Sequence, residues 1–230
     1  MKNTLLAGLP ALNLQLNDGQ IETFCRFGEM LLEKNQVMNL TAIKTPEGVA
    51  KLHFLDSLTL LDAQDLTGKT VIEVGCGAGF PGVPLKIGCP GMDLTLLDSL
   101  GKRMDWLREV LPQLGVEAKV VTARAEEHAQ KHREAYDVCV SRAVARLNIL
   151  AELCLPLVKV GGMFICMKGA QTMEELDEAQ KALTTLGGRV LDVCPYTVDD
   201  AVHYVVMVEK VRPTPPQHPR DFARIKKKPL

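Results

Sequence analysis

A short glycine-rich stretch between Val71 and Gly82 restricts the fold of this chain more than any other feature. An apolar run ends in Glu73, and the loop that follows contains four glycines, Gly75, Gly77, Gly79 and Gly82. Because glycine has no Cβ, such a loop can turn sharply and bring its backbone close to a ligand. The pattern predicts a strand–loop–helix unit that grips a nucleotide-like molecule.

A second acidic residue, Asp98, ends the next apolar run, and a carboxylate at the tip of a second strand can accept hydrogen bonds from ribose hydroxyls. Gly77-x-Gly79-x-x-Gly82 matches the dinucleotide fingerprint, but S-adenosyl-L-methionine (SAM) is the second ligand to consider. Glu73 favours SAM, because a carboxylate repels a pyrophosphate and attracts a sulfonium or an ammonium group. A glycine-rich turn with no ligand is the third alternative.

From Thr70 onward, apolar runs alternate with helical patterns, which predicts a parallel sheet with helices on both faces. The expected strands are 70–75, 93–98, 117–121, 136–140, 162–167, 189–194 and 202–210. The expected helices are 80–88, 101–114, 124–132, 145–158 and 172–186. The last two strands are too close in sequence for a helical crossover, so we expect them to pair antiparallel. This is the α/β layout of class I SAM-dependent methyltransferases, a Rossmann-like seven-stranded sheet whose last strand is antiparallel.

The 230 residues divide into three expected parts. Residues 1–66 form an N-terminal helical extension, with one helix starting at Asn17 or Asp18 and another at Thr45-Pro46. Residues 67–210 form the SAM-binding core. Residues 211–230 form a Pro-rich tail with six basic residues and one acidic residue, in a chain of net charge −1. This basic tail suits a phosphate-bearing partner, although a solvated tail without a partner explains it equally well.

Cysteine usage and hydropathy indicate the cellular compartment. The seven cysteines are scattered, with no CxxC pair, which indicates a reducing cytoplasm and argues against a zinc site. We expect no membrane segment and no signal peptide, because no apolar run has the required length and the N-terminus lacks an apolar core. His128 and His132 have metal-ligand spacing, but without a third ligand a solvated helix face is expected, and no metal.

In an open α/β sheet, ligands bind beyond the carboxyl ends of the strands. A backbone N–H of Ala125 or Glu126, after the third strand, is expected to meet an adenine, the alternative being an ordinary acidic helix start. Arg142, after the fourth strand, suits an anion: the cofactor carboxylate, a phosphate, or the O6 and N7 edge of guanine. A structural ion pair is the alternative for Arg142.

Three further cations are candidates for RNA contacts. Lys102 and Arg103 open a helix, where cations oppose the helix dipole, and RNA phosphate would offset this cost. Lys168 follows the fifth strand and would flank the target. No Ser/His/Asp arrangement or carboxylate pair indicates acid–base catalysis.

With these residues assembled, the chain resembles the small-subunit rRNA guanine-N7 methyltransferase G family, the RsmG or GidB proteins. The resemblance rests on Asn39-Leu40-Thr41, His53 to Ser57, the glycine loop with Phe80-Pro81-Gly82, Leu97 to Arg103, Ser141-Arg142-Ala143 and Lys168-Gly169. It implies cofactor positions at Gly75, Phe80, Ala125, Glu126 and Arg142. In the tail, His218 stands where longer family members have the Tyr of a Tyr-Pro-Arg segment.

The resemblance implies a target, the guanine at position 527 of 16S rRNA in the decoding region. The substrate is then naked rRNA, an assembly intermediate or the small ribosomal subunit. Guanine N7 has a lone pair at neutral pH, so no proton has to leave before in-line methyl transfer and no general base is needed. Catalysis then rests on positioning and electrostatics, with Arg142 and Lys168 as candidates. A dinucleotide-dependent dehydrogenase and a non-catalytic ribosome-binding factor are the competing functions.

Overall fold

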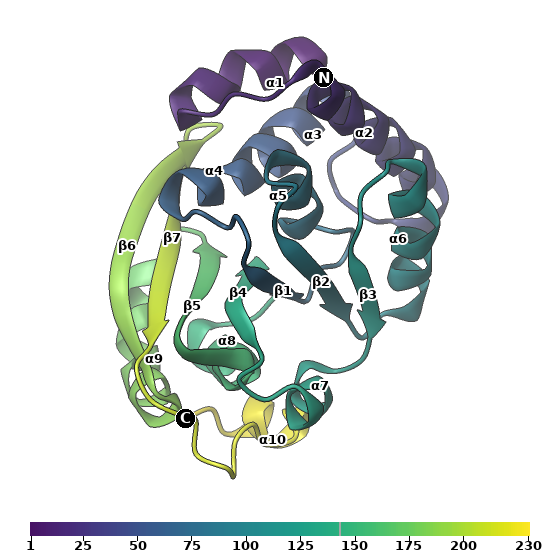
Figure 1. Cartoon of the computed structure of the whole chain (residues 1–230). Helices are drawn as coiled ribbons and strands as arrows, with labels where there is room; N and C mark the ends of the chain where they lie inside the picture. The colour runs from purple at the N-terminus through teal and green to yellow at the C-terminus, as the bar shows by residue number, and fades with distance from the viewer. Residues whose placement is uncertain (143) are drawn as a thin grey trace.

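A seven-stranded mixed sheet forms the centre of the computed structural model, which describes residues 1–142 and 144–230 (Figure 1). The strands are β1 (Thr70–Val74), β2 (Asp93–Asp98), β3 (Lys119–Thr122), β4 (Tyr136–Arg142), β5 (Val158–Lys168), β6 (Gly188–Val198) and β7 (Ala201–Lys210). Their order across the sheet is β3-β2-β1-β4-β5-β7-β6. Strand β7 runs antiparallel to β5 and β6, while β1 to β5 pair in parallel. The predicted fold class, with its antiparallel last strand, is confirmed.

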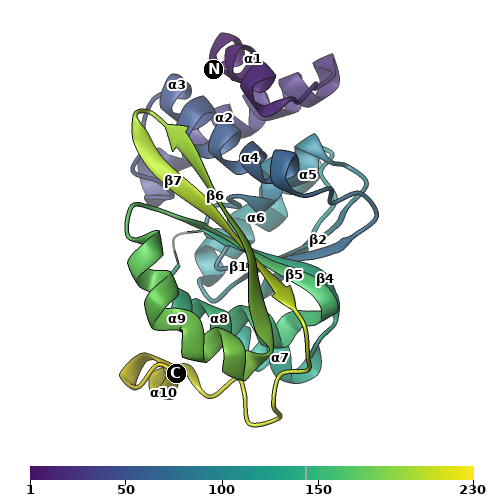
Figure 2. The same ribbon diagram turned by 90° about the vertical axis from the view of Figure 1, so that its left-hand side faces the viewer.

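Helices cover both faces of this sheet (Figure 2). One face carries α1 (Lys2–Gly8), α2 (Asp18–Met38), α3 (Pro46–Val49), α4 (Asp56–Ala63), α5 (Gly82–Gly88) and α6 (Gly101–Gln113). The other carries α7 (Ala125–Lys131), α8 (Leu147–Cys154), α9 (Thr172–Leu186) and α10 (Phe222–Lys227). Short helical turns complete the set, namely η1 (Leu9–Leu12), the π-helical η2 (Ala50–Leu55) and η3 (Leu155–Leu157). In the described part of the chain, no helix is long and apolar enough to span a membrane.

The helices of the N-terminal extension begin where the sequence places their caps. At the start of α2, the Asn17 side chain accepts a hydrogen bond from the Gln20 N–H at 2.9 Å, and the Gln20 side chain accepts one from the Asn17 N–H at 2.9 Å. At the start of α3, the Thr45 hydroxyl accepts one from the Gly48 N–H at 3.1 Å. These bonds satisfy N–H groups that lack a partner within a helix.

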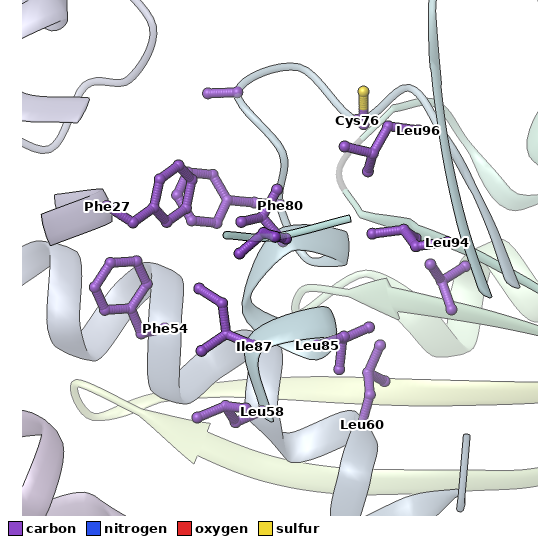
Figure 3. Packing of buried hydrophobic residues seen from close by; sticks show 14 of the residues in the cluster. Phe27, Phe54, Leu58, Leu60, Cys76, Phe80, Leu85, Ile87, Leu94 and Leu96 are labelled. Carbon is purple, nitrogen blue, oxygen red and sulfur yellow. The ribbon is translucent and has the colours of Figure 1, made fainter. Parts of the chain in front are cut away.

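The extension is joined to the glycine loop by an aromatic cluster (Figure 3). The ring of Phe27, from α2, lies 5.5 Å from the ring of Phe80, 5.9 Å from that of Phe54 and 6.1 Å from that of Trp106, measured between ring centroids. Phe27 and Phe54 are fully buried. The extension therefore shares one hydrophobic core with the loop that follows β1 and is not an independent unit.

Two regions differ most from the prediction, while most other boundaries differ by at most two residues. The helix predicted over 145–158 ends at Cys154, because Pro156 has no backbone N–H to continue it; the turn η3 follows and β5 starts at Val158, not at 162. The region 195–201, predicted as a connection, belongs mostly to a long hairpin of β6 and β7. Its two-residue turn is Asp199-Asp200, with φ values of 50° and 66°, the left-handed conformation that a tight hairpin turn requires.

Candidate cofactor and substrate site

A cavity of about 530 Å³ opens beyond the carboxyl ends of β1, β2, β3 and β4. Its wall combines the glycine loop, the strand tips, the N-terminal extension and the C-terminal tail. The residues that line it include Leu40, Thr41, His53, Gly75, Gly77, Phe80, Asp98, Leu100, Arg103, Ala123, Arg124, Ala125, Glu126, Arg142, Leu153 and Phe222. The structure thus brings most of the predicted cofactor residues to one place.

The glycine loop is held against the tip of β2. The N–H of Gly75 donates to the Leu97 carbonyl at 2.8 Å, and the N–H of Gly77 donates to Asp98 Oδ2 at 2.9 Å. Gly75 and Gly77 have φ values of 73° and 55°, which glycine adopts without strain. Gly79, also predicted as a cofactor position, is not among the residues lining the cavity; a Cβ there would lie 2.6 Å from Val83 Cγ2. Packing of the loop on α5 explains that glycine.

Asp98 organises the loop and also faces the cavity. Its Oδ2 accepts from Gly77, and its Oδ1 accepts from the N–H of Leu100 at 2.9 Å, just before α6. A carboxylate has about four lone-pair sites. These two bonds therefore leave acceptor capacity on each oxygen for ribose hydroxyls.

Glu73 does not have the role that the sequence suggested. Its side chain is fully buried beneath the loop and does not line the cavity, and its Oε2 accepts from the N–H of Gly82 at 2.8 Å. A Cβ at Gly82 would lie 2.3 Å from that oxygen, so this close approach requires glycine. Burial raises the pKa of Glu73 to about 8. The charge of Glu73 therefore does not select the ligand, contrary to the sequence-based prediction, because β1 directs this side chain under the loop, where it holds the loop in place.

Arg142 lies in the cavity wall and is fixed by the N-terminal extension. Its Nη1 donates to Asp56 Oδ2 at 2.6 Å, and its Nη2 donates to His53 Nδ1 at 3.1 Å. The guanidinium carbon lies 5.4 Å from the centre of the Phe80 ring, within cation–π distance. The ion pair that was the alternative interpretation is therefore present, and Arg142 faces the cavity as well.

His53 is held as a neutral imidazole between Arg142 and Phe80. Its ring stacks on the Phe80 ring with centroids 4.3 Å apart, and its Nε2 lies 2.7 Å from Thr41 Oγ1. Because a guanidinium only donates, Nδ1 is the acceptor and Nε2 carries the hydrogen toward Thr41. Burial and the nearby Arg142 lower the pKa of His53 to about 4. At neutral pH both ring nitrogens are occupied, so His53 orients its neighbours and does not carry protons.

Asp56 and Tyr196 support Arg142 from outside the cavity wall; the sequence singled out Asp56 only as part of the segment His53 to Ser57, and Tyr196 not at all. Asp56 is buried, and its Oδ1 accepts a hydrogen bond from the Tyr196 hydroxyl at 2.8 Å. Tyr196 lies on β6, 140 residues from Asp56 in sequence, so no local pattern could have paired them. Through this network the extension and the far edge of the sheet both hold Arg142.

The start of α7 forms another part of the wall. Ala125 and Glu126 line the cavity, and the first N–H groups of a helix have no partner within that helix. These N–H groups are therefore free to donate toward the cavity, and their contact with an adenine remains a prediction. The Glu126 side chain is buried, with 7% of its surface exposed.

The three basic residues proposed for RNA lie in different surroundings. Lys102 is exposed in the first turn of α6, whereas Arg103 is half-buried and lines the cavity. Neither forms an ion pair with any residue of the ranges described. Lys168 instead is buried and forms an ion pair with Glu175 at 2.6 Å, away from the cavity wall.

The remaining residues of interest have local partners. The Ser141 hydroxyl donates to the Val74 carbonyl at 2.8 Å and ties β4 to β1. Ala143, which belongs to the Ser-Arg-Ala segment, lies outside the described residues. His128 stacks on His132 and bonds the Tyr136 hydroxyl at 2.9 Å. Within residues 1–142 and 144–230, no group of three His, Cys, Asp or Glu side chains is arranged to hold a metal.

Comparison with known proteins identifies the family. Residues 20–200 match the family model described as "rRNA small subunit methyltransferase G". The chain belongs to this methyltransferase family. It is 47% identical to the ribosomal RNA small subunit methyltransferase G of Alkaliphilus metalliredigens (strain QYMF), over 100% of this chain and 98% of that protein.

Solved structures agree on the fold. The precorrin-6y C5,15-methyltransferase of Geobacter metallireducens GS-15 has a TM-score of 0.53 at 15% identity, covering 68% of this chain and 88% of that one. A SAM-dependent methyltransferase from Aquifex aeolicus has a TM-score of 0.53 at 18% identity, covering 74% and 96%. These similarities show the class I methyltransferase fold.

SAM is the cofactor of this methyltransferase, and the cavity suits it. The cavity wall offers acceptor oxygens at Asp98, N–H donors at the start of α7 and a cation at Arg142, which are groups that suit a ribose, an adenine and a carboxylate. In a dinucleotide-binding protein, the N–H groups of this loop face the pyrophosphate. Here the Gly77 N–H donates to Asp98 and is not available for a phosphate oxygen. The donors and acceptors along the wall therefore match a molecule with an adenosine and an amino-acid end.

Proposed function

We propose that this methyltransferase transfers a methyl group from SAM to N7 of the guanine at position 527 of 16S rRNA, in the decoding region. One observation supports guanine N7 as the atom that accepts the methyl group. The histidine that lines the cavity, His53, is neutral and has both ring nitrogens engaged, so the described wall offers no imidazole base. A target that needs no deprotonation fits this wall, and guanine N7 is such a target. The names of the relatives support rRNA of the small subunit as the substrate class.

The mechanism rests on positioning. SAM supplies the electrophilic methyl group. Asp98 and the loop hold the ribose end, and Arg142 orients an anionic group or the guanine edge. Arg142 has five N–H donors, and its contacts with Leu52, His53 and Asp56 use three of them. Two donors remain for the O6 and N7 edge of guanine or for the cofactor carboxylate, which aligns the reactants for in-line transfer.

The RNA partner is the 16S rRNA in the small subunit or in an assembly intermediate, and the cytoplasm is the proposed site of action. Lys102 and Arg103 lie at the rim, where they can contact phosphates. The exposed residues Lys226, Lys227 and Lys228 of the tail add positive charge on the surface. Lys168 contributes to RNA binding only if its ion pair with Glu175 opens.

Methyl incorporation tests the proposal. The protein is incubated with radiolabelled SAM and with small subunits that lack N7-methylguanine, and the labelled base is mapped. We expect label at one guanine N7 in the decoding region. Label on a different base would overturn the target. No label on subunits or on protein-free rRNA would favour a non-catalytic ribosome-binding factor.

Replacing Arg142 tests its part in this function. We expect Arg142→Ala to lower methyl transfer by roughly 100-fold, because misplacing a positioning group costs about this much. Single-turnover rates and SAM affinity are measured for the wild type, Arg142→Ala and the control Lys131→Ala, which lies on α7 away from the cavity wall. A variant with both values near wild type would contradict the role of Arg142.

A further inference from the structure

The basic tail is folded against the core. Glu152, on α8, is fully buried and accepts hydrogen bonds from three groups of Arg220: the backbone N–H at 3.0 Å, Nε at 2.8 Å and Nη2 at 2.6 Å. His218 Nδ1 lies 2.8 Å from the same carboxylate. On the other side, the Arg133 guanidinium donates to the His218 carbonyl at 2.7 Å and to the Pro215 carbonyl at 2.9 Å. These contacts fix the path of residues 214–220.

This path leads the tail to the cofactor cavity. The short helix α10 starts at Phe222 and contacts α8 at the end of the molecule where the chain terminates (Figure 1). Its Ile225 side chain is fully buried in the same hydrophobic cluster as α8. Asp221 caps the helix, accepting from the Arg224 N–H at 3.0 Å. The ring of Phe222 then lies in the cavity wall beside Ala123, Ala125 and Leu153. The tail thus delivers an aromatic side chain to the end of the cavity formed by the β3 tip and α7.

The ring of Phe222 is held in position. The Arg124 guanidinium carbon lies 5.8 Å from the centre of the ring, so the Arg124 cation covers it at cation–π distance. Phe222 is half-buried and packs on the core beneath α7 and α8. An aromatic side chain that stays partly exposed in a ligand cavity has surface left for a flat ligand.

We propose that the tail, residues 211–230, is part of the cofactor site, and that Phe222 is a cofactor-binding residue at the adenine end. The residues after β3 offer N–H donors to the purine edge, and Phe222 offers apolar surface to the purine. The exposed side chain of Leu100 lines the same cavity and adds further apolar surface. This inference concerns cofactor binding alone, so its test does not depend on which base of the rRNA is methylated.

Binding measurements without RNA test the proposal. Isothermal titration calorimetry is performed on the full-length wild type, Phe222→Ala, Phe222→Tyr and Lys227→Ala, with S-adenosylhomocysteine as the ligand. We expect Phe222→Ala to raise the Kd by roughly tenfold, since removal of a side chain that stacks on a base has an effect of this size. Phe222→Tyr retains the ring, and Lys227→Ala changes an exposed residue of the same helix. Both variants should bind S-adenosylhomocysteine with a Kd within about twofold of the wild-type value.

A second ligand locates the contact within the cofactor. 5′-Methylthioadenosine has the adenine and ribose but no amino-acid end. If Phe222 contacts the adenine, Phe222→Ala weakens both ligands by the same factor. If only S-adenosylhomocysteine is weakened, the adenine assignment is wrong.

Proteolysis tests the reciprocal effect and remains informative if Phe222→Ala is less stable. Binding and tail docking must influence each other equally. Saturating S-adenosylhomocysteine should therefore slow trypsin cleavage after Arg224 and Lys226 by up to about tenfold in the wild type and in Phe222→Tyr, but not in Phe222→Ala. Cleavage sites are mapped by mass spectrometry. Equal affinity of the wild type and Phe222→Ala, or ligand-independent cleavage of the wild-type tail, would overturn the proposal.

Discussion

Glu73 is a carboxyl group placed where water does not reach it, between β1 and the loop that holds the cofactor. One oxygen accepts from the Gly82 N–H, while the other, Oε1, has no hydrogen-bond partner among the described residues. Burial disfavours the charged form, which is why the pKa rises to about 8. The same residue that fixes the loop therefore makes the stability of the folded state depend on pH between about 4.5 and 8.

The sign of this sensitivity follows from the raised pKa. Between pH 4.5 and 8 the unfolded chain loses the Glu73 proton while the folded protein keeps it, so this group's contribution to stability declines as pH rises through that window. Glu73→Gln cannot lose a proton. We expect the stability of Glu73→Gln relative to wild type to increase with pH, by at most about 1.4 kcal/mol per pH unit.

Urea unfolding of both proteins at pH 5, 6, 7 and 8 measures this difference. Glu126→Gln, at a second buried acidic residue, which unlike Glu73 lines the cavity, serves as the comparison. Stability curves of wild type and Glu73→Gln that stay parallel from pH 5 to 8 would show that Glu73 is ionised in the folded protein.

Among the elements, α2 and the π-helical turn η2 position the Phe80 ring, which lines the cavity. Phe27 is fully buried and does not line the cavity, but its ring contacts Phe80, which does. His53, from η2, also stacks on the Phe80 ring. Helices that cover the sheet therefore also determine where the Phe80 ring lies.

Phe27→Leu tests this connection between packing and binding. We expect it to destabilise the protein by about 1–2 kcal/mol, because the smaller side chain loses ring contacts and leaves a void. We also expect weaker S-adenosylhomocysteine binding, since Phe80 loses its support. Leu31→Ala, on the same helix, is the control: it should lose at least as much stability, about 2–5 kcal/mol, but leave the affinity unchanged. Equal affinity losses in both variants would mean that general destabilisation, not the Phe80 contact, causes the effect.

Patterns within one element were predictable from the sequence. Asn17 and Thr45 mark helix starts, and α9 has the predicted bounds of 172 and 186. Strand β6 was predicted too short, because Pro195 resembles a strand terminator. Pro195 is tolerated since β6 is the edge strand of the sheet, where a missing N–H costs little.

Contacts between distant elements could not be predicted. Arg142 meets Asp56 across 86 residues, and nothing in the local sequence of either residue indicates the other. The orientation of the Glu73 side chain could not be predicted either. The strand that carries it was predicted, but whether a side chain at its end faces the ligand or lies under the loop depends on how the loop folds over the strand.

In the whole molecule, segments from both ends of the chain complete the cavity beyond the carboxyl ends of the parallel strands. Thr41 and His53 come from the extension, and Phe222 comes from the tail. The six basic residues of the tail therefore do not act as one charged unit. Arg220 neutralises the buried Glu152, whereas Lys226, Lys227 and Lys228 remain exposed to solvent.

The pair of Glu152 and Arg220 is expected to control tail docking. Burial alone would raise the pKa of Glu152, but hydrogen bonds from Arg220 and His218 outweigh it and hold the pKa below its ordinary value. This contribution to stability is therefore present above the ordinary pKa and is lost as pH falls through the lowered one. Removing Arg220 leaves a buried carboxylate with His218 as its remaining side-chain partner in the described structure.

A double-mutant cycle measures the coupling. We expect Arg220→Met to cost about 3–5 kcal/mol, because it leaves a buried charge without its cation. Glu152→Leu should cost less, since the 22% exposed Arg220 side chain can turn to water. The double variant should then be close to Glu152→Leu, so the coupling should approach the cost of Arg220→Met, about 3–5 kcal/mol. Urea unfolding of the four proteins at pH 7 gives these values, and additive single effects would show that tail docking does not depend on this ion pair.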